Sequence, residues 1–285
     1  MIETFGEIIN TWQMFQHSYY AGLLSAASLA LISLIIVGKR RDFLGASLSQ
    51  VSLMSIALIL SLESYLVHLS IELTESLFLQ YFLSIFVSIG FAYFILEFFQ
   101  PKKLHSHLSV VVYLLGACSS VLLVVNSPHG TEEIHQLNSS SLIGANYYDV
   151  IVLSIVLICS LIYFERNYKK LYLFLLDSEM ASTIGISSKK THLEFSILIG
   201  TIIGVSLKVV GFLFCFAFSV LPALCVIQLR TSMKSFHWFA MALASLCVLI
   251  SFYFSMYWDM PLTQLAVLFA LLQYFFISIL QMQKT

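Results

Sequence analysis

The sequence contains few charged residues. Asp, Glu, Lys and Arg make up 10% of its 285 residues, whereas apolar types make up 59%. A soluble domain has about a quarter of its residues charged, so this chain lacks the polar coat that a water-soluble fold of its size needs. Several apolar runs reach the length of a membrane-spanning helix, about 20 residues. They are continuously apolar rather than alternating, which excludes a β-barrel and predicts an all-α, polytopic membrane bundle.

Common catalytic motifs are also missing. The sequence has no HExxH, GxSxG or Walker loop, so we assign it neither metalloprotease chemistry nor ATP hydrolysis and expect it not to be an enzyme. Its cysteines form no CxxC pair and fall in apolar runs, which favours packing roles over a disulfide or a zinc site. They are Cys118, Cys159, Cys215, Cys225 and Cys247.

No internal repeat, low-complexity tract or long linker divides the chain. We therefore expect residues 1–285 to form a single transmembrane domain. The stretch from Met1 to Gln16 contains Glu3 and Glu7, lacks a basic start and has no clean apolar core. These features lead us to expect no cleavable signal peptide.

About nine membrane spans can be laid out along the apolar runs. The stretch 193–229 is nearly unbroken, and as one helix it would measure about 55 Å, nearly twice a hydrocarbon core of about 30 Å. We therefore interpret it as a hairpin with its turn near Lys208 to Gly211. The expected spans are 18–38, 43–62, 78–99, 108–125, 148–165, 193–209, 212–229, 236–257 and 262–281.

The basic residues predict the orientation of these spans. The chain has 14 Lys and Arg residues, and with the N-terminus outside and the C-terminus in the cytoplasm only Lys208 falls outside the cytoplasmic segments. The expected outer segments carry Glu and Asp but no Lys or Arg. Cytoplasmic loops of membrane proteins are enriched in basic residues, so this asymmetry supports both the orientation and the number of spans.

Four collinear stretches carry a more specific signal. Residues 19–53 read YYAGLLSAASLALISLIIVGKRRDFLGASLSQVSL, and residues 176–190 read LDSEMASTIGISSKK, with the pattern D-x-E-x-A-x-x-x-G. Residues 206–226 read SLKVVGFLFCFAFSVLPALCV, and residues 257–268 read YWDMPLTQLAVL, with a D-x-P turn before the last span. Across about residues 18–281, the chain resembles the permeases of the zinc and manganese class of ABC importers, as a divergent member.

The resemblance implies a complex with several partners. Such permeases work as dimers, homomeric or heteromeric, and bind ATP-hydrolysing subunits in the cytoplasm. An extracytoplasmic solute-binding protein delivers a divalent metal, which is the transported substrate. The resemblance also implies that this chain lies in the bacterial inner membrane, contacts lipid but no nucleic acid, holds no cofactor of its own and leaves ATP to its partner subunit.

The longest expected cytoplasmic connection is residues 171–192. It combines acidic residues, a glycine break and the basic pair Lys189–Lys190. A short amphipathic helix in this segment would suit docking to another protein, and the alternative is an ordinary solvated loop. By resemblance, the residues that couple the permease to the ATPase are Asp177, Glu179, Ala181 and Gly185.

The second expected span is polar for a membrane segment, with serines at 47, 49, 52 and 55 and a glutamine at 50. The family usually has GDALSHA here, whose Asp and His, four residues apart, share a helix face and can bind a transition metal. This chain has Ala46 and Gln50 at those positions. Two interpretations stay open: a helix packed among other helices, or the lining of a translocation path with Gln50 facing the solute. The candidate path residues are Ala46, Ser49, Gln50 and Leu53.

Polar residues near the expected outer surface are further candidates. Lys208 lies in or beside the membrane, and we expect a structural role for it at the hairpin. Asp259 is expected to cap or orient the last helix. One outer stretch has donors suited to zinc or manganese, and its alternative is a solvated loop facing the binding protein. Its residues are His129, Glu132, Glu133 and His135.

Three functions fit the sequence. The first is the permease subunit of an ATP-driven importer of zinc, manganese or iron. The second keeps the complex but not the metal site: a divergent half that pairs with a ligand-bearing homologue or carries another solute. The third is a secondary transporter or channel without an ATPase, which broken helices and buried charge would support. Only Lys208 favours this third function.

Overall fold

The structure is all helical over the part of the chain that it describes. The computed structural model describes residues 2–39, 41–67, 77–97, 105–125, 145–230, 235–258 and 260–282, with the isolated positions 132, 134, 135, 138, 142 and 232. No strand occurs among these residues, which confirms the predicted all-α class. The helices are α1 (Ile2–Gly38), α2 (Leu44–Val67), α3 (Leu77–Glu97), α4 (His105–Val124), α6 (Tyr147–Leu176), α7 (Ser178–Thr183), α8 (Ser188–Phe218), α9 (Leu221–Gln228), α10 (Phe236–Trp258) and α11 (Leu262–Met282).

Most of these helices are long and apolar enough to cross a membrane. Backbone N–H and C=O groups have no water to bond in lipid, and a helix pairs them within one segment. The seven long candidates among the described residues are Phe15–Gly38, Leu44–Leu62, Gln80–Glu97, Tyr147–Leu176, Ser188–Gln228, Phe236–Trp258 and Leu262–Gln281. The shorter Leu108–Val124 of α4 is also apolar. With α4 included and the long Ser188–Gln228 stretch divided, this multi-pass architecture agrees with the predicted count of about nine.

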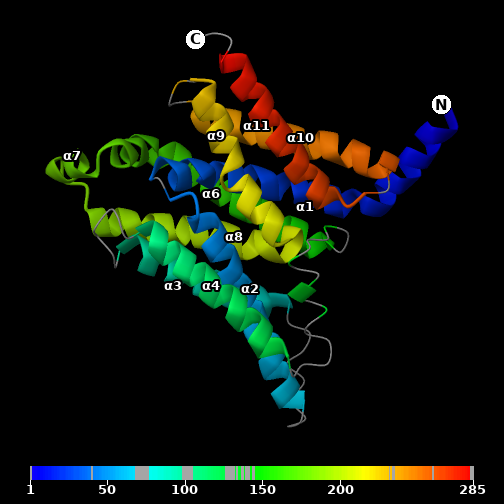
Figure 1. Cartoon of the computed structure of the whole chain (residues 1–285), viewed down its shortest axis with the longest axis horizontal. Coiled ribbons are helices and arrows are strands. Elements are labelled where there is room, and N and C mark those ends of the chain that lie inside the picture. The colour runs from blue at the N-terminus through cyan, green and yellow to red at the C-terminus, as the bar shows by residue number, and fades with distance from the viewer. Residues whose placement is uncertain are drawn as a thin grey trace.

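The division of Ser188–Gln228 comes from a break at Gly211. This residue has φ 77° and ψ 177°, a conformation that glycine adopts readily and that other residues rarely adopt. In Figure 1 the yellow segment that follows the break turns back towards α9. The break lies within the turn predicted near Lys208 to Gly211.

A second break separates α8 from α9, and here the structure differs from the single span predicted over 212–229. Ser219 and Val220 lie between the two helices, and Pro222 lies in the first turn of α9. A proline has no N–H and is tolerated in a first turn, whereas inside a helix its ring clashes with the preceding turn. Pro222 therefore explains why the helix stops and starts again at this point.

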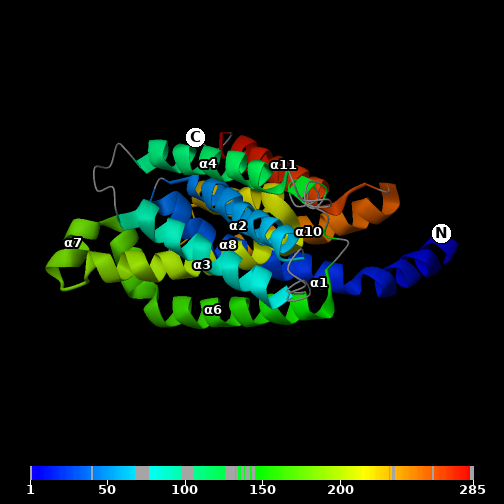
Figure 2. The same cartoon turned by 90° about the horizontal axis from the view of Figure 1, so that it is seen from below.

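The helices form three groups across the molecule (Figure 1). α2, α3 and α4 lie on one side, α1, α6 and α8 form the middle, and α9, α10 and α11 lie on the other side. The groups are in contact, because α2 and α3 pack against α8 and α1 packs against α10. The short helix α7 forms one extreme of the molecule, called the α7 end below, and the N-terminus lies at the opposite extreme (Figure 2).

α6 is longer than the span predicted at 148–165. It continues to Leu176, because the charged residues that end its apolar run, such as Glu165 and Lys170, are good helix formers. The connection predicted over 171–192 is correspondingly shorter: only 177–187 separate α6 from α8, and α7 occupies most of that segment.

Candidate functional site

The path candidates on α2 lie inside the molecule. Ala46, Gln50 and Leu53 have the spacing of one helix face, and Ser49 lies beside them. All four are buried, and α2 packs against α3, α4 and α8. α4 comes close at Gly116, where an added Cβ would lie 2.9 Å from the carbonyl carbon of Gln50. α2 is thus an interior helix, and its burial agrees with both interpretations of its polar residues.

The α2 serines are satisfied within their own helix. Each of these buried hydroxyls donates a hydrogen bond to a backbone carbonyl three or four residues earlier, at 2.6–2.9 Å. The Ser52 hydroxyl also bonds that of Ser88 on α3, which ties the two helices together. These hydroxyls need no external partner, so the packing interpretation accounts for Ser47, Ser49, Ser52 and Ser55.

Gln50 is different. Its side chain is 4% exposed, and its amide oxygen accepts no hydrogen bond from the described residues. Leaving a buried polar atom unpaired costs about 1–3 kcal/mol, and natural proteins rarely carry that cost without a function. Among the polar path candidates on α2, Gln50 is therefore the residue whose polarity is not explained by hydrogen bonds within the described structure.

No resident metal site accompanies Gln50 in the described structure. Over the described residues, no group of three or more His, Cys, Asp or Glu side chains lies close enough together to hold a metal ion. Ala46 offers no ligand atom, and an amide binds transition metals less well than a carboxylate or an imidazole. Among the four path candidates, the side-chain oxygens of Gln50 and Ser49 are the ligand atoms that a solute could meet, and both are neutral.

The segment predicted to couple to an ATPase forms a compact helical connection. Asp177 ends α6, and its carboxylate accepts a hydrogen bond of 3.1 Å from the backbone N–H of Met180 in α7. Ala181 is fully buried, and its carbonyl accepts a bond of 3.0 Å from the N–H of Ile186. Gly185 turns the chain with φ 90°. Glu179 belongs to α7, but its side chain lies outside the described part of the structure.

The α7 end also exposes apolar side chains. Leu176, Met180 and Ile184 are 68%, 53% and 62% exposed. They recur every four residues across a segment that also carries acidic and hydroxyl groups. Exposed apolar groups in such a polar setting are typical of a surface that another protein covers.

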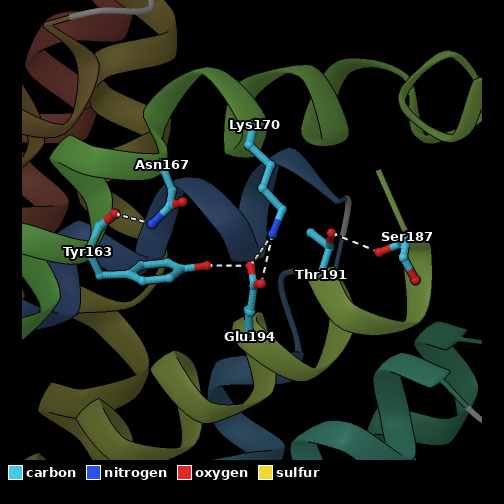
Figure 3. Close-up of polar contacts among 6 residues, drawn as sticks. All are labelled: Tyr163, Asn167, Lys170, Ser187, Thr191 and Glu194. Atoms are coloured by element: carbon cyan, nitrogen blue, oxygen red, sulfur yellow. Dashed lines mark hydrogen bonds and ion pairs between the residues drawn. The ribbon is translucent and has the colours of Figure 1, made fainter. Parts of the chain in front are cut away.

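A polar cluster joins α6 and α8, the two helices that flank α7. It consists of Tyr163, Lys170 and Glu194 and is called the Glu194 junction below. The Tyr163 hydroxyl donates to the Glu194 carboxylate at 2.6 Å. The Lys170 ammonium contacts both carboxylate oxygens at 2.7 and 2.6 Å. Figure 3 shows the α6 side chains and the Glu194 side chain of α8 meeting between the helices. This cluster links the two ends of the α7 connection.

A second cluster, the Asp149 junction of Tyr81, Asp149 and Lys208, joins α3, α6 and α8 away from the α7 end. The Tyr81 hydroxyl donates to the Asp149 carboxylate, and the Lys208 ammonium lies 4.4 Å from the centre of the Tyr81 ring. The other Asp149 oxygen accepts the backbone N–H of Asn146 at 2.8 Å and caps α6. Lys208 thus contacts an aromatic face beside the Gly211 break, in agreement with the expected structural role.

The candidate metal donors of the outer stretch are only partly described. Glu132 and His135 are exposed, whereas His129 and Glu133 lie outside the described residues. Asp259, expected to cap the last helix, also lies outside them. The predicted contacts of this stretch with a metal or a binding protein stay predictions.

The family model of the ABC 3 transport family matches residues 11–281 of the chain. The chain belongs to the ABC 3 transport family. This membership confirms the resemblance drawn from the four collinear stretches, because the match spans all of them. It also agrees with the multi-pass helical architecture.

Individual proteins are similar to this ABC 3 family member over most of its length. It is 23% identical, over 251 residues, to a Haemophilus influenzae protein assigned as the membrane protein of an iron transport system, covering 87% of this chain and 86% of that protein. PsaBC from Streptococcus pneumoniae, solved with a Fab, matches with a TM-score of 0.78 at 14% identity, over 97% of this chain and 95% of that one. An inward-facing ABC transporter assigned to the metal-chelate type matches with a TM-score of 0.74 at 14% identity, over 95% of this chain and 88% of that one. These structural matches show a shared fold.

Reasoning from the sequence overlooked two sets of residues in this family member. Leu176, Met180 and Ile184 could have been found from their regular spacing in a charged connection. Tyr163 and Glu194 had no such signal, because they are 31 positions apart in the chain and only the packing of α6 on α8 brings them together.

Proposed function

We propose that the chain is the membrane-spanning permease subunit of an ATP-driven importer for divalent transition metal ions, zinc, manganese or iron. The observation that carries the proposal is the family match over 11–281. The relative in an iron transport system and the structural neighbour of the metal-chelate type support metal as the solute. ATP hydrolysis belongs to a separate subunit, and this chain provides the path.

In the proposed complex the α7 end faces the cytoplasm of a bacterium and binds the ATPase. Lys39, Lys169, Lys170, Lys189 and Lys190 occur next to α7 or in the helix ends beside it, as the positive-inside rule requires. The exposed side chains of Leu176, Met180 and Ile184 form the apolar part of the docking surface. A second permease chain and an extracytoplasmic binding protein complete the importer in the inner membrane.

The docking surface can be tested without disturbing the fold. Replacing Leu176, Met180 and Ile184 together with serine removes exposed apolar surface, so the permease should stay folded but retain less ATPase on co-purification. Leu122→Ser on α4 is the matched control, because Leu122 is 72% exposed, similar to the 68% of Leu176, and lies on another helix. Equal ATPase recovery from the triple variant and the control would contradict the assignment. A chain that never binds an ATPase would instead favour a secondary transporter or channel.

The solute path is proposed to pass the face of α2 that carries Ala46, Ser49, Gln50 and Leu53. The unpaired amide oxygen of Gln50 supports this position, because a passing cation could bind there briefly. With neutral oxygens as the side-chain ligands and no carboxylate or imidazole, metal binding is expected to be weak, which suits passage more than storage.

Restoring a carboxylate and an imidazole tests the path. The double variant Ala46→Asp and Gln50→His places both donors one helical turn apart and should increase the affinity of the detergent-purified protein for zinc or manganese. Metal content and affinity are compared with those of the wild type and of Ser47→Asp with Val51→His, the same change shifted by one residue. Tight metal binding near Gln50 in the wild type, or no gain in the double variant, would contradict this account.

A second candidate function has its own observation. Since Ala46 and Gln50 lack the ligands usual in the family, the chain is a divergent half in this alternative and pairs with a ligand-bearing homologue or carries another solute. The subunit composition of the purified complex separates the two. A homodimer that transports metal supports the first function, and a heterodimer supports the second.

A further inference from the structure

The Glu194 junction lies close to α7. Lys170 is six positions before the last residue of α6, Leu176, and Glu194 is six positions after the first residue of α8, Ser188. At about 1.5 Å per residue each is about 9 Å along its helix from the connection. The junction therefore lies within about two helical turns of the α7 connection on both helices.

The α7 end of α6 is also held by apolar and mixed contacts. The Lys39 ammonium at the end of α1 donates to the Phe174 carbonyl at 2.9 Å and lies 3.9 Å from the centre of the Phe174 ring. That ring packs edge-on against His192 and Phe195 of α8. These contacts hold the end of α6 against α1 and α8 but include no ion pair between α6 and α8. The Glu194 junction provides that ion pair.

α8 continues from the junction to the candidate path. An added Cβ at Gly200 would lie 2.6 Å from the backbone nitrogen of Ile89, so α8 and α3 are in backbone contact. The Ser84 hydroxyl of α3 also donates to the Gly204 carbonyl of α8 at 2.9 Å. α3 in turn is tied to the candidate path helix α2 through Ser88 and Ser52. These contacts form a continuous packed connection from α8 through α3 to α2.

We propose that Glu194 is a positioning residue that couples movement of α7 to α8 and, through α8 and α3, to the solute path on α2. The proposal rests on the proposed function, in which α7 binds the ATPase. The Glu194 side chain accepts hydrogen bonds from Tyr163 and Lys170 of α6. While this junction is closed, α6 and α8, which flank α7, move as one unit. The lysine and the carboxylate are each 30% exposed, so water can reach the pair and the junction can open and close during a transport cycle.

The test uses the complete importer reconstituted in liposomes: permease, ATPase and binding protein. Manganese(II), zinc(II) and iron(II) are the probe metals. Two quantities are measured, the basal ATPase rate and the metal transported per ATP hydrolysed. Glu194→Ala should assemble with the ATPase and hydrolyse ATP, but transport per ATP should decrease by about fivefold or more, a value at the low end of typical coupling effects. Tyr163→Phe leaves the ion pair between Lys170 and Glu194 in place and should decrease transport per ATP less.

A charge exchange separates positioning from simple structural damage. Lys170→Glu and Glu194→Lys should each decrease transport per ATP, and the double variant should recover most of the wild-type ratio. Glu165→Ala is the matched control, since Glu165 is another α6 carboxylate, 3.3 Å from His237 on α10, and does not contact α8 through an ion pair.

Each outcome has a defined meaning. An unchanged ratio in Glu194→Ala overturns the inference, and so does an assembled double variant that stays as impaired as the single ones. If Glu194→Ala fails to assemble, the double variant decides alone. A wild-type complex with no ATP-dependent transport of zinc, manganese or iron would count against the proposed function, which makes the two failures distinguishable.

Discussion

The Asp149 junction and the Glu194 junction have the same chemical parts in different surroundings. Each combines a tyrosine hydroxyl that donates to a carboxylate with a nearby lysine, and each involves α6 and α8. In the Asp149 junction the carboxylate and the tyrosine are 6% and 8% exposed, whereas in the Glu194 junction the charged pair is 30% exposed. The lysines differ too, because Lys208 lies over an aromatic face and Lys170 contacts the carboxylate.

The difference in burial predicts a difference in mobility. A buried carboxylate that loses its partners stays without water and costs several kcal/mol, so the Asp149 junction holds α3, α6 and α8 in a fixed arrangement. A partly exposed pair contributes about 0–1 kcal/mol, because water replaces each partner when the pair opens. α8 is thus anchored in its second half and adjustable near α7.

The largest effect should come from Asp149→Ala. The change removes the acceptor of Tyr81 and the cap of α6 together, and we expect a loss of about 3 kcal/mol in the free energy of unfolding. The measurement is the apparent melting temperature of the detergent-purified permease, followed by size-exclusion chromatography after heating. Asp149→Asn keeps an acceptor oxygen and should lose less. A greater loss in Glu194→Ala than in Asp149→Ala would reverse the comparison.

Packing between the junctions should come next. Gly200→Ala forces a methyl group against the backbone of Ile89, and overpacking of this kind costs about 2 kcal/mol. The same thermal assay checks it. Gly90→Ala on α3 is the control, because an added Cβ there meets no atom within 4 Å, and it should be neutral or slightly stabilising. Equal melting temperatures for both variants would show that α3 and α8 can separate.

The two tyrosines allow the same change in both junctions. Tyr81→Phe should lower the free energy of unfolding by about 2 kcal/mol, because a buried carboxylate loses a donor. Tyr163→Phe should lower the free energy of unfolding by about 0.5 kcal/mol, since Lys170 and water can still donate hydrogen bonds to Glu194. Parallel melting curves measure the difference between the variants. Indistinguishable losses would mean that exposure does not separate the junctions.

The smallest effect concerns salt. Dissolved salt weakens the attraction between solvent-exposed charges and affects buried groups much less. The loss in Glu194→Gln, about 0.5 kcal/mol at low ionic strength, should therefore shrink as sodium chloride is added. The loss in Asp149→Asn should hardly change. Melting curves across a salt series test this, and a salt response of Asp149→Asn as large as that of Glu194→Gln would contradict the assigned burial.

Much of the fold could be predicted from the sequence, because a segment that crosses lipid must be apolar and must pair its own backbone groups, as a helix does. Continuous apolar runs located the spans. The length limit of a bilayer placed a turn near Lys208 to Gly211, and the structure has its break at Gly211, within that range. The helical extension to Leu176 was missed, because charge marks the end of a span but not the end of a helix.

The candidate site was less accessible to sequence reasoning. The sequence marked all the polar residues of α2 as one group. The structure distinguishes them, because the serine hydroxyls donate to the backbone of their own helix, whereas the Gln50 amide oxygen accepts no hydrogen bond from the described residues. Tyr163, Lys170 and Glu194 had no motif, since their meeting depends on how α6 packs against α8. Contacts between distant helices are not encoded in local patterns.

The length of α6 makes bilayer thickness part of the mechanism. Its 30 residues measure about 45 Å, as much as a bilayer with its headgroups, whereas the hydrocarbon core is about 30 Å thick. We expect Asp149, in the first turn of α6, to lie near one membrane surface. The last turns of α6 would then extend beyond the acyl chains on the other side. A membrane of longer lipids would draw the surroundings of Lys170 and Glu194 towards the hydrocarbon and strengthen their attraction. We therefore expect acyl-chain length to influence how readily the proposed movement of the α7 end occurs.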